Sequence, residues 1–412
     1  MLKSLESGTE IVSIMSKRVA IVNQVGFDGG GITKLGIEYS KLSFDVYFKN
    51  IIQPLQFIPD DIGNVQVYTS VAELLNIIDI NGYDRIIFLP LALYDKDLES
   101  ALQSVLQIRA SYPHIELCYL FCNRRVMRIK RLLEVCKNNK FSFNHYFSIT
   151  PDLFNYVKNC TYLNVNAFTF SDTVIKEAHS RKKIIFSAGR VEAVRGTIAY
   201  FQSINSEFLT DDFYYIHEGA KYQFTKSGIS VTPQLFSLFD MTHSPKTVLP
   251  NYKFLNYLEA PAIDKLNIYP SYKIDDALVR WSDYYLGVCC ILGSKSACTK
   301  NKSLFKTVLT ASDPAENKKL NKLALVWNDI LEYADIEKIT SGVPVLFSSM
   351  YSQIIKFTDD RLIYNSFSDI PKKAKLLESQ YDDARTKQYE WLINKLNSVN
   401  ENIIKKFTEE FK

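Results

Sequence analysis

Segments of strand-like and helix-like sequence alternate along this chain, and the alternation occurs in two successive series. In the first series, apolar strand-like runs lie at residues 17–24, 46–48, 85–91 and 115–121. Helical periodicity fills the gaps between them, for example at residues 97–108 and 126–136. Parallel strands need a long crossover, usually a helix, whereas antiparallel strands can be joined by a tight turn. The alternation therefore predicts an α/β fold with doubly wound parallel sheets.

A second series begins near residue 182 and predicts a second domain of the same kind. Its strand-like runs are residues 184–187, 213–217 and 343–347, and residues 162–170 are expected to form the last strand and exit of the first domain. A chain of 412 residues is too long for one ordinary core. The expected parts are an N-terminal extension at 1–16, Rossmann-like domains at 17–175 and 176–375, and a charged helical segment at 376–412 that packs back across both domains.

Composition narrows the class of protein further. Hydrophobic residues make up 47% and charged residues 23% of the chain, as in soluble globular proteins. The seven cysteines include no paired CxxC motifs, so we expect reduced thiols and neither a disulfide framework nor a zinc site. We expect no secretory signal at residues 1–16 and no membrane helix, since no apolar run approaches ~18 residues. A net charge of +4 means that contact with a polyanion needs local clustering of cations.

A glycine-containing turn follows the first strand of each series. Three consecutive glycines end at Gly31 in the turn at residues 26–31, and residues 189–196 read Gly-Arg-Val-Glu-Ala-Val-Arg-Gly. Glycines let backbone approach a ligand, and Arg190 and Arg195 offer fixed forks of donors to phosphate oxygens. The pattern suits a diphosphate lying between two domains. Ordinary tight turns with solvated arginines are the alternative.

A third candidate site lies at residues 331–345, where a helical pattern is followed by Gly342 and an apolar strand containing proline. This arrangement places Glu337 near the carboxyl edge of a sheet, where a carboxylate can accept both hydroxyls of a ribose. Glu332 could serve a sugar hydroxyl. Asp335 fits a helix-surface acid better than a ligand.

Five cations fall within eight residues just after the strand at 115–121. They are Arg124, Arg125, Arg128, Lys130 and Arg131. Contact with a phosphate backbone needs such a cluster, and each contact adds a salt-dependent increment of affinity. A solvated helix face is the usual explanation of a charge run. Because this run adjoins the proposed cleft, we favour DNA binding.

Three phosphate- and ribose-suited sites, in this order on two α/β halves, resemble the GT-B glycosyltransferases, whose two Rossmann-like domains face a cleft. Residues 26–34, Glu218-Gly219, residues 263–267, and Leu331-Glu332-Tyr333 with Glu337 are similar to the DNA α-glucosyltransferases of T-even-type phages. That family attaches a sugar to 5-hydroxymethylcytosine in DNA with retention at the anomeric carbon. The resemblance implies donor contacts from Gly29, Gly30, Gly31, Gly189, Arg190, Arg195, Glu218, Glu332, Glu337 and Gly342.

One departure from that family affects the expected mechanism. Where the family carries a catalytic His-Asp pair, this chain reads Cys122-Asn123. Asparagine does not titrate and a free cysteine has a pKa of ~8.5, so neither is a good general base. In a retaining transfer the departing diphosphate can take the acceptor proton, and Arg190 and Arg195 would then supply most of the catalysis. We expect Asn123 to orient the sugar or the acceptor, and we give His114 and His145 no role.

The sequence therefore predicts an enzyme that moves glucose, or a pentose such as arabinose, from a UDP-sugar to 5-hydroxymethylcytosine in double-stranded DNA. We expect a monomer that requires no metal or other cofactor, contacts no membrane, and protects phage DNA from nucleases in the cytoplasm of the infected bacterium. Two alternatives stay open. The chain could glycosylate a bacterial polysaccharide or teichoic acid, or it could be a catalytically inactive GT-B binding module.

Overall fold

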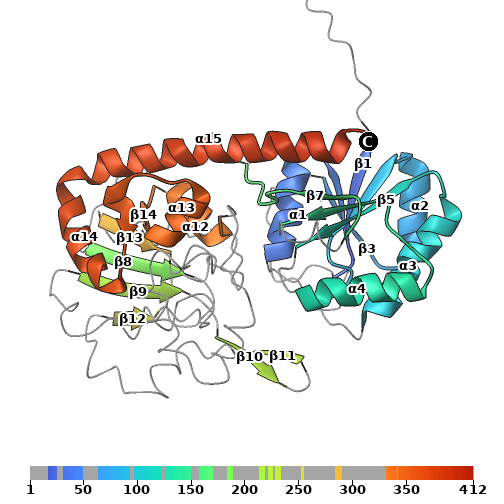
Figure 1. The fold of residues 1–412 in the computed structure, drawn as a ribbon, viewed down its shortest axis with the longest axis horizontal. Helices are drawn as coiled ribbons and strands as arrows, with labels where there is room; N and C mark the ends of the chain where they lie inside the picture. The colour runs from blue at the N-terminus through green and yellow to red at the C-terminus, as the bar shows by residue number, and fades with distance from the viewer. Residues whose placement is uncertain are drawn as a thin grey trace, which may run out of the picture.

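The computed structural model describes residues 17–25, 31–49, 64–92, 97–122, 126–149, 157–169, 183–188, 213–218, 221–225, 228–232, 252–254, 284–289, 331–340 and 342–411. Within these residues the chain forms two parallel sheets flanked by helices, joined by one long C-terminal helix (Figure 1). The predicted α/β class with doubly wound sheets is confirmed.

The first sheet has the strand order β3-β2-β1-β4-β5-β6-β7, and every neighbouring pair is parallel. Its strands are β1 (Val19–Asn23), β2 (Asp45–Lys49), β3 (Val65–Tyr68), β4 (Arg85–Phe88), β5 (Glu116–Phe121), β6 (His145–Ser148) and β7 (Cys160–Tyr162). The accompanying helices are α1 (Gly31–Lys41), α2 (Val71–Asn81), α3 (Leu98–Ser111) and α4 (Val126–Asn138).

Alternate residues of β1 supply two separate cores, because successive side chains of a strand point to opposite faces of its sheet. Val19 and Ile21 belong to the core that contains the apolar residues of α1. Ala20 and Val22 belong to the core that contains those of α2, α3 and α4. Helices therefore cover both faces of the sheet. On the α1 side the approach is so close that a Cβ at Gly36 would collide with the ring of Phe48.

The second sheet has the order β12-β9-β8-β13-β14-β15, again with parallel neighbours throughout. Its strands are β8 (Lys183–Ala188), β9 (Phe213–Glu218), β12 (Tyr252–Phe254), β13 (Tyr284–Val288), β14 (Val345–Ser348) and β15 (Ile363–Tyr364). An antiparallel pair, β10 (Lys221–Thr225) and β11 (Gly228–Thr232), stands apart from it. The helices described here are α12 (Tyr333–Thr340), α13 (Ser349–Ile355), α14 (Ile370–Leu377) and α15 (Tyr381–Thr408).

The exit from the first sheet differs from the predicted strand at residues 162–170. Strand β7 ends at Tyr162, and residues 163–169 form no regular structure. Side chains, rather than a neighbouring strand, make hydrogen bonds with backbone groups of this segment. The Tyr39 hydroxyl donates to the carbonyl of Val165, and the Tyr333 hydroxyl donates to that of Ala167. The segment is therefore a connector that both domains hold.

Helix α15 spans 28 residues and contacts both domains (Figure 1). Near its start, the buried amide of Gln388 accepts a hydrogen bond from the backbone N–H of Val345 at 2.7 Å and donates to the carbonyl of Val345 at 2.8 Å. Near its end, the Phe407 ring lies against Tyr39 and Phe147 of the first domain. The predicted crossing segment is thus present, although residue 376 lies in α14. No helix in the described parts of the chain is long and apolar enough to cross a membrane.

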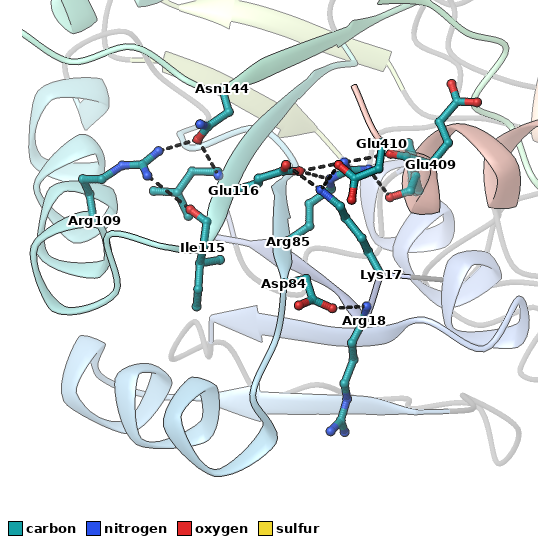
Figure 2. A network of polar contacts seen from close by, with 12 residues as sticks. Lys17, Arg18, Asp84, Arg85, Arg109, Ile115, Glu116, Asn144, Glu409 and Glu410 are labelled. Atoms are coloured by element: carbon teal, nitrogen blue, oxygen red, sulfur yellow. Dashed lines mark hydrogen bonds and ion pairs between the residues drawn. The ribbon is translucent and has the colours of Figure 1, made fainter. Parts of the chain in front are cut away.

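A buried arginine holds the C-terminal end of α15 against the first sheet (Figure 2). Arg85 is fully buried, and its Nε donates to Glu116 at 2.8 Å. Its two terminal nitrogens donate to the backbone carbonyls of Phe407 and Glu409, and its guanidinium lies 3.7 Å from the centroid of the Phe411 ring. A helix C-terminus exposes carbonyls without intrahelical partners and carries partial negative charge. The Arg85 cation satisfies both needs.

Replacing Arg85 should therefore loosen α15 as well as destabilise the fold. We expect Arg85→Ala to lower the free energy of unfolding by about 3–5 kcal/mol, since it leaves buried acceptors unpaired. Urea denaturation measures this loss, and hydrogen exchange of the amides at 400–409 measures the release of the helix end. The matched control is Arg109→Ala. Arg109 also donates to carbonyls, those of Pro113 and Ile115, but does not touch α15.

The control should cost about 1 kcal/mol and leave exchange in α15 unchanged. Equal losses in the two variants, with α15 equally protected in both, would contradict the role assigned to Arg85.

Candidate active site

The two predicted turns follow the strands at which the strand order of each sheet reverses. In the first sheet the order passes from β2 through β1 to β4, and in the second from β9 through β8 to β13. Ligands of open α/β sheets bind in the crevice beyond the carboxyl ends of the strands at such a switch point. Strand β1 ends at Asn23, just before the turn at 26–31, and β8 ends at Ala188, just before Gly189. The fold thus places the carboxyl ends of β1 and β8 where ligand sites are expected.

Much of the two turns lies outside the described residues. This applies to Gly29 and Gly30 in the first turn and to Gly189, Arg190 and Arg195 in the second, as well as to Asn123, Arg124 and Arg125. Their assigned roles stay predictions. Gly31 is the first residue of α1, so the first turn ends at a helix N-terminus. Glu218 is the last residue of β9 and pairs with Ala188, which puts its backbone beside the start of the second turn.

Two polar side chains that the sequence analysis did not single out lie at the end of β1. Asn23 is fully buried and Gln24 is nearly so. The Nδ2 of Asn23 and the Nε2 of Gln24 are both buried and have no hydrogen-bond partner. Buried donors without partners are rare in proteins and call for an explanation, such as a ligand. A polar pair at the end of an otherwise apolar strand was the signal available in the sequence.

Glu337 is the most unusual polar residue of the described chain. It lies on α12 with only 3% of its surface exposed, and within the described part of the chain neither of its carboxylate oxygens has a hydrogen-bond partner of good geometry. The Nζ of Lys34, on α1 of the other domain, lies 3.0 Å from its Oε1. This contact is an ion pair, and it opposes the rise of the Glu337 pKa that burial causes. The carboxylate therefore has charge compensation and retains its capacity to accept hydrogen bonds.

Burial raises the pKa of Glu337 to about 7. The Lys34 ammonium opposes this rise, whereas the Glu38 carboxylate adds to it. A strongly perturbed carboxyl group with a specific charged partner is typical of functional sites. Near neutral pH the group exists in both protonation states. Its ability to accept two hydroxyl donors depends on which state is present, because only the ionised form is purely an acceptor.

Gly342 follows the C-terminus of α12, and its backbone conformation explains why this position is a glycine. Its φ is +81°, in the left-handed region that favours glycine. Its N–H donates to the carbonyl of Ile339 at 3.0 Å, as expected after a helix C-terminus. Glu332 directly precedes α12 and is half-buried. The donor-binding roles of both residues stay predictions.

The prediction that Asp335 is a helix-surface acid is wrong. Asp335 is 3% exposed, and its Oδ1 accepts a hydrogen bond at 2.9 Å from Lys338, which is itself fully buried. Helix α12 is covered by the second sheet, by α15 and by the connector at 163–169, so it has little free surface. An ion pair one helical turn apart makes the burial of two charges tolerable.

Neither Cys122, which follows β5, nor His145, which begins β6, is suited to act as a general base. Burial raises the pKa of the Cys122 thiol to about 12, which rules it out as a base near neutral pH. Burial also lowers the pKa of His145 to about 4, and its ring stacks on Phe411, so His145 is structural. On α4, Lys130 and Arg131 are exposed, and Arg131 pairs with Glu134 at 2.8 Å. For Arg128 the structure describes only the helical backbone.

The raised pKa of Glu337 predicts a stability that falls as pH rises. A carboxyl group whose pKa is about 7 when folded and 4.5 when unfolded binds its proton more tightly in the folded state. Its contribution is therefore complete below pH 4.5 and is lost between about pH 4.5 and pH 7. Glu337→Gln removes this loss.

We expect the free energy of unfolding of the variant, relative to the native chain, to rise by roughly 2–4 kcal/mol between pH 4.5 and pH 8. Urea denaturation of both proteins at several pH values measures it. An exposed acid on α15 supplies the control, Glu390→Gln, which should show no such change. A constant difference across this range would contradict the assignment of a raised pKa to Glu337.

The fold is that of known GT-B glycosyltransferases. An alpha-glucosyltransferase in complex with UDP and a 13-mer DNA superposes with a TM-score of 0.57 at 12% identity, covering 95% of this chain and 100% of the other. The same kind of enzyme with UDP-glucose and DNA containing an abasic site gives 0.57 at 12% identity, covering 94% and 99%. A glycosyltransferase from Rickettsia africae gives 0.54 at 10% identity, covering 96% and 100%. No protein-family model matches the chain, and no curated protein matches its sequence. The predicted GT-B architecture is confirmed.

Proposed function

We propose that this protein is a glycosyltransferase that moves a sugar from a UDP-sugar to 5-hydroxymethylcytosine in DNA. The observation that carries the proposal is Glu337, a buried carboxylate at the contact of two domains that pairs with Lys34 and has no hydrogen-bond partner of good geometry among the described residues. A ribose offers two adjacent hydroxyl donors, which are the groups such a carboxylate lacks. The GT-B fold of the chain agrees with a nucleotide-sugar ligand, as does the position of β1 and β8 at the switch points of the two sheets.

The transfer is proposed to proceed with retention and without a protein base. The bond between the anomeric carbon and the diphosphate oxygen breaks, the acceptor oxygen bonds to that carbon on the same face, and the acceptor proton passes to the departing phosphate. Arg190 and Arg195 stabilise the charge that develops on the diphosphate. Asn123 orients the sugar or the acceptor. This route agrees with the high pKa of Cys122, which leaves that thiol protonated.

DNA is the proposed acceptor because cations gather beside the proposed cleft. Strand β5 ends at Phe121, and the cationic run starts three residues later and continues into α4. An alpha-glucosyltransferase of the same fold was determined with DNA bound. A base within a duplex must leave the stack to react, at a cost of a few kcal/mol. We further propose that the enzyme acts as a monomer in the cytoplasm of an infected bacterium and shields phage DNA from nucleases.

A transfer assay tests the proposal directly. The protein is incubated with labelled UDP-glucose or UDP-arabinose and with duplex DNA that contains either hydroxymethylcytosine or cytosine. We expect transfer to the hydroxymethylated duplex alone, and the preferred donor identifies the sugar. Absence of transfer from every UDP-sugar would sink the proposal. UDP binding without turnover on any acceptor would indicate an inactive binding module, and transfer to teichoic acid would indicate a wall-modifying enzyme.

The ribose contact of Glu337 predicts discrimination between UDP and 2′-deoxy-UDP. Hydrogen bonds to a charged group contribute about 1.5–3 kcal/mol, so the native protein should bind UDP about 10–100-fold more tightly than the deoxy form. Glu337→Ala should bind both weakly and about equally. Isothermal titration calorimetry measures the four dissociation constants, with Glu390→Ala as control. Preserved discrimination in Glu337→Ala would remove the residue from the ribose site.

The basic run predicts the salt dependence of DNA binding. A triple change of Arg124, Arg125 and Arg128 to alanine should reduce the slope of log K against log salt concentration by about 2–3, since each phosphate contact contributes ~0.9. Fluorescence anisotropy with a labelled duplex at several salt concentrations measures the slope. The control is a triple alanine change on α14 of the other domain, at Lys372, Lys373 and Lys375. An unaltered slope in the first variant would return the run to an ordinary solvated helix face.

A further inference from the structure

We infer that Lys34, a residue of the first domain, is a positioning residue for the nucleotide that the second domain binds. Its ammonium favours the ionised form of the Glu337 carboxylate and holds this group in place, so that the ribose site is complete only while the two domains are in contact. The inference rests on the proposed function, because it takes the ribose of a UDP-sugar as the ligand of Glu337.

The contacts around Lys34 hold its ammonium in one position at the contact between the domains. Lys34 lies on α1 and is 5% exposed, with its Nζ 3.0 Å from Glu337 Oε1 and 3.6 Å from Glu38 Oε1. The ring centroids of Phe168 and Tyr333 lie 5.3 Å and 5.9 Å from the same nitrogen. These rings come from the connector and from α12, so the cation sits where both domains meet. The ion pair is made with Oε1 of Glu337, and Oε2 has no hydrogen-bond partner among the described residues.

The charges around Glu337 come from both domains. From α1 it faces Lys34 and Glu38, and from its own helix the Lys338 ammonium, with Tyr333 neutral beside it. Lys338 already pairs with Asp335. The Oε2 of Glu38 accepts hydrogen bonds from the N–H and hydroxyl of Thr169. Lys34 is therefore the closest positive charge that acts on Glu337.

Removing this cation would change which protonation state of Glu337 prevails. A carboxyl group that is wholly buried without a counter-charge stays protonated well above its usual range. A protonated carboxyl group carries one donor of its own and cannot accept both ribose hydroxyls as the ionised form does. Because burial raises the pKa of Glu337 to about 7 even beside Lys34, loss of Lys34 would move ionisation clearly above neutral pH.

The arrangement also links nucleotide binding to the contact between the domains. Lys34 reaches the site from the first domain, whereas Glu337 belongs to the second. A nucleotide that prefers ionised Glu337 therefore prefers the state in which the domains touch, and the preference is reciprocal. Binding would then also release a proton near neutral pH, since hydrogen bonds to the charged form favour that form.

The test measures the affinity of UDP-glucose between pH 6 and pH 8.5 by calorimetry. UDP-glucose serves as the probe because its diphosphate does not titrate in this range. For the native protein we expect affinity to rise with pH, with a midpoint near 7. In Lys34→Met the midpoint should move up by at least about one unit, which gives an affinity loss of about fivefold or more at pH 7. Lys34→Arg should restore the native profile.

Two further variants make the result specific. Glu38→Gln removes the neighbouring negative charge and should move the midpoint down, in the direction opposite to Lys34→Met. Its side chain can still accept the hydrogen bonds of Thr169, so the connector keeps a partner. Lys41→Met is the control. Lys41 lies 3.8 Å from Glu38 and is partly exposed, and its removal should leave the profile nearly unchanged.

The outcomes separate this inference from the proposed function. A midpoint unchanged in both Lys34→Met and Glu38→Gln would overturn the inference, as would an affinity loss in Lys34→Met of the same size at every pH. If the native protein does not bind UDP-glucose at any pH, or if Glu337→Gln binds it with the native affinity and profile, the proposed function of the site fails instead.

Discussion

The two domains depend on one helix that belongs to both of their cores. Helix α15 bonds to β14 through Gln388 and packs against the first domain through Phe407. A single hydrophobic core rarely extends over a chain of this length, so the chain divides into two domains. The orientation of one domain relative to the other must then be fixed by an element that contacts both. In this protein that element is the single helix α15. The Arg85 guanidinium holds the C-terminal end of α15 by donating hydrogen bonds to the carbonyls of Phe407 and Glu409.

Besides α15, hydrogen bonds between the connector at 163–169 and the second domain hold the two domains together near the candidate site. The Asn166 amide donates to the carbonyl of Leu331, and the Tyr333 hydroxyl donates to that of Ala167. Both bonds lie next to α12, the helix that carries Glu337. The junction therefore positions a carboxylate whose burial is costly and whose hydrogen-bonding capacity is unused. Groups whose burial lowers the stability of the fold are common at functional sites, where the same group is needed for binding or catalysis.

The sequence predicted the architecture well because hydrophobic alternation is a local property. Strands β2, β5 and β8 fall where apolar runs stand between helical patterns. Strands β3, β6 and β13 escaped notice because exposed or polar residues, or a glycine, interrupt their apolar pattern. The site was predicted in part. Glu337 was singled out from its local pattern, and its role in binding stays a prediction. Lys34 was given no role and Asp335 was expected at the surface, because tertiary contacts determine the partner of Lys34 and the burial of Asp335. The ion pair between Lys34 and Glu337 joins residues 303 positions apart, which no periodicity reveals.

The continuity of α15 makes its length a geometric parameter of the whole molecule. Phe407 lies nineteen positions after Gln388, which corresponds to about 28 Å of helix at 1.5 Å per residue. Each residue added or removed between them would turn one domain relative to the other by about 100° as well as shift it. A natural or engineered homologue can therefore change the segment only by whole turns, and even then the domains would move apart by about 5 Å per turn. The length of α15 therefore determines both the distance between the two domains and the rotation of one relative to the other.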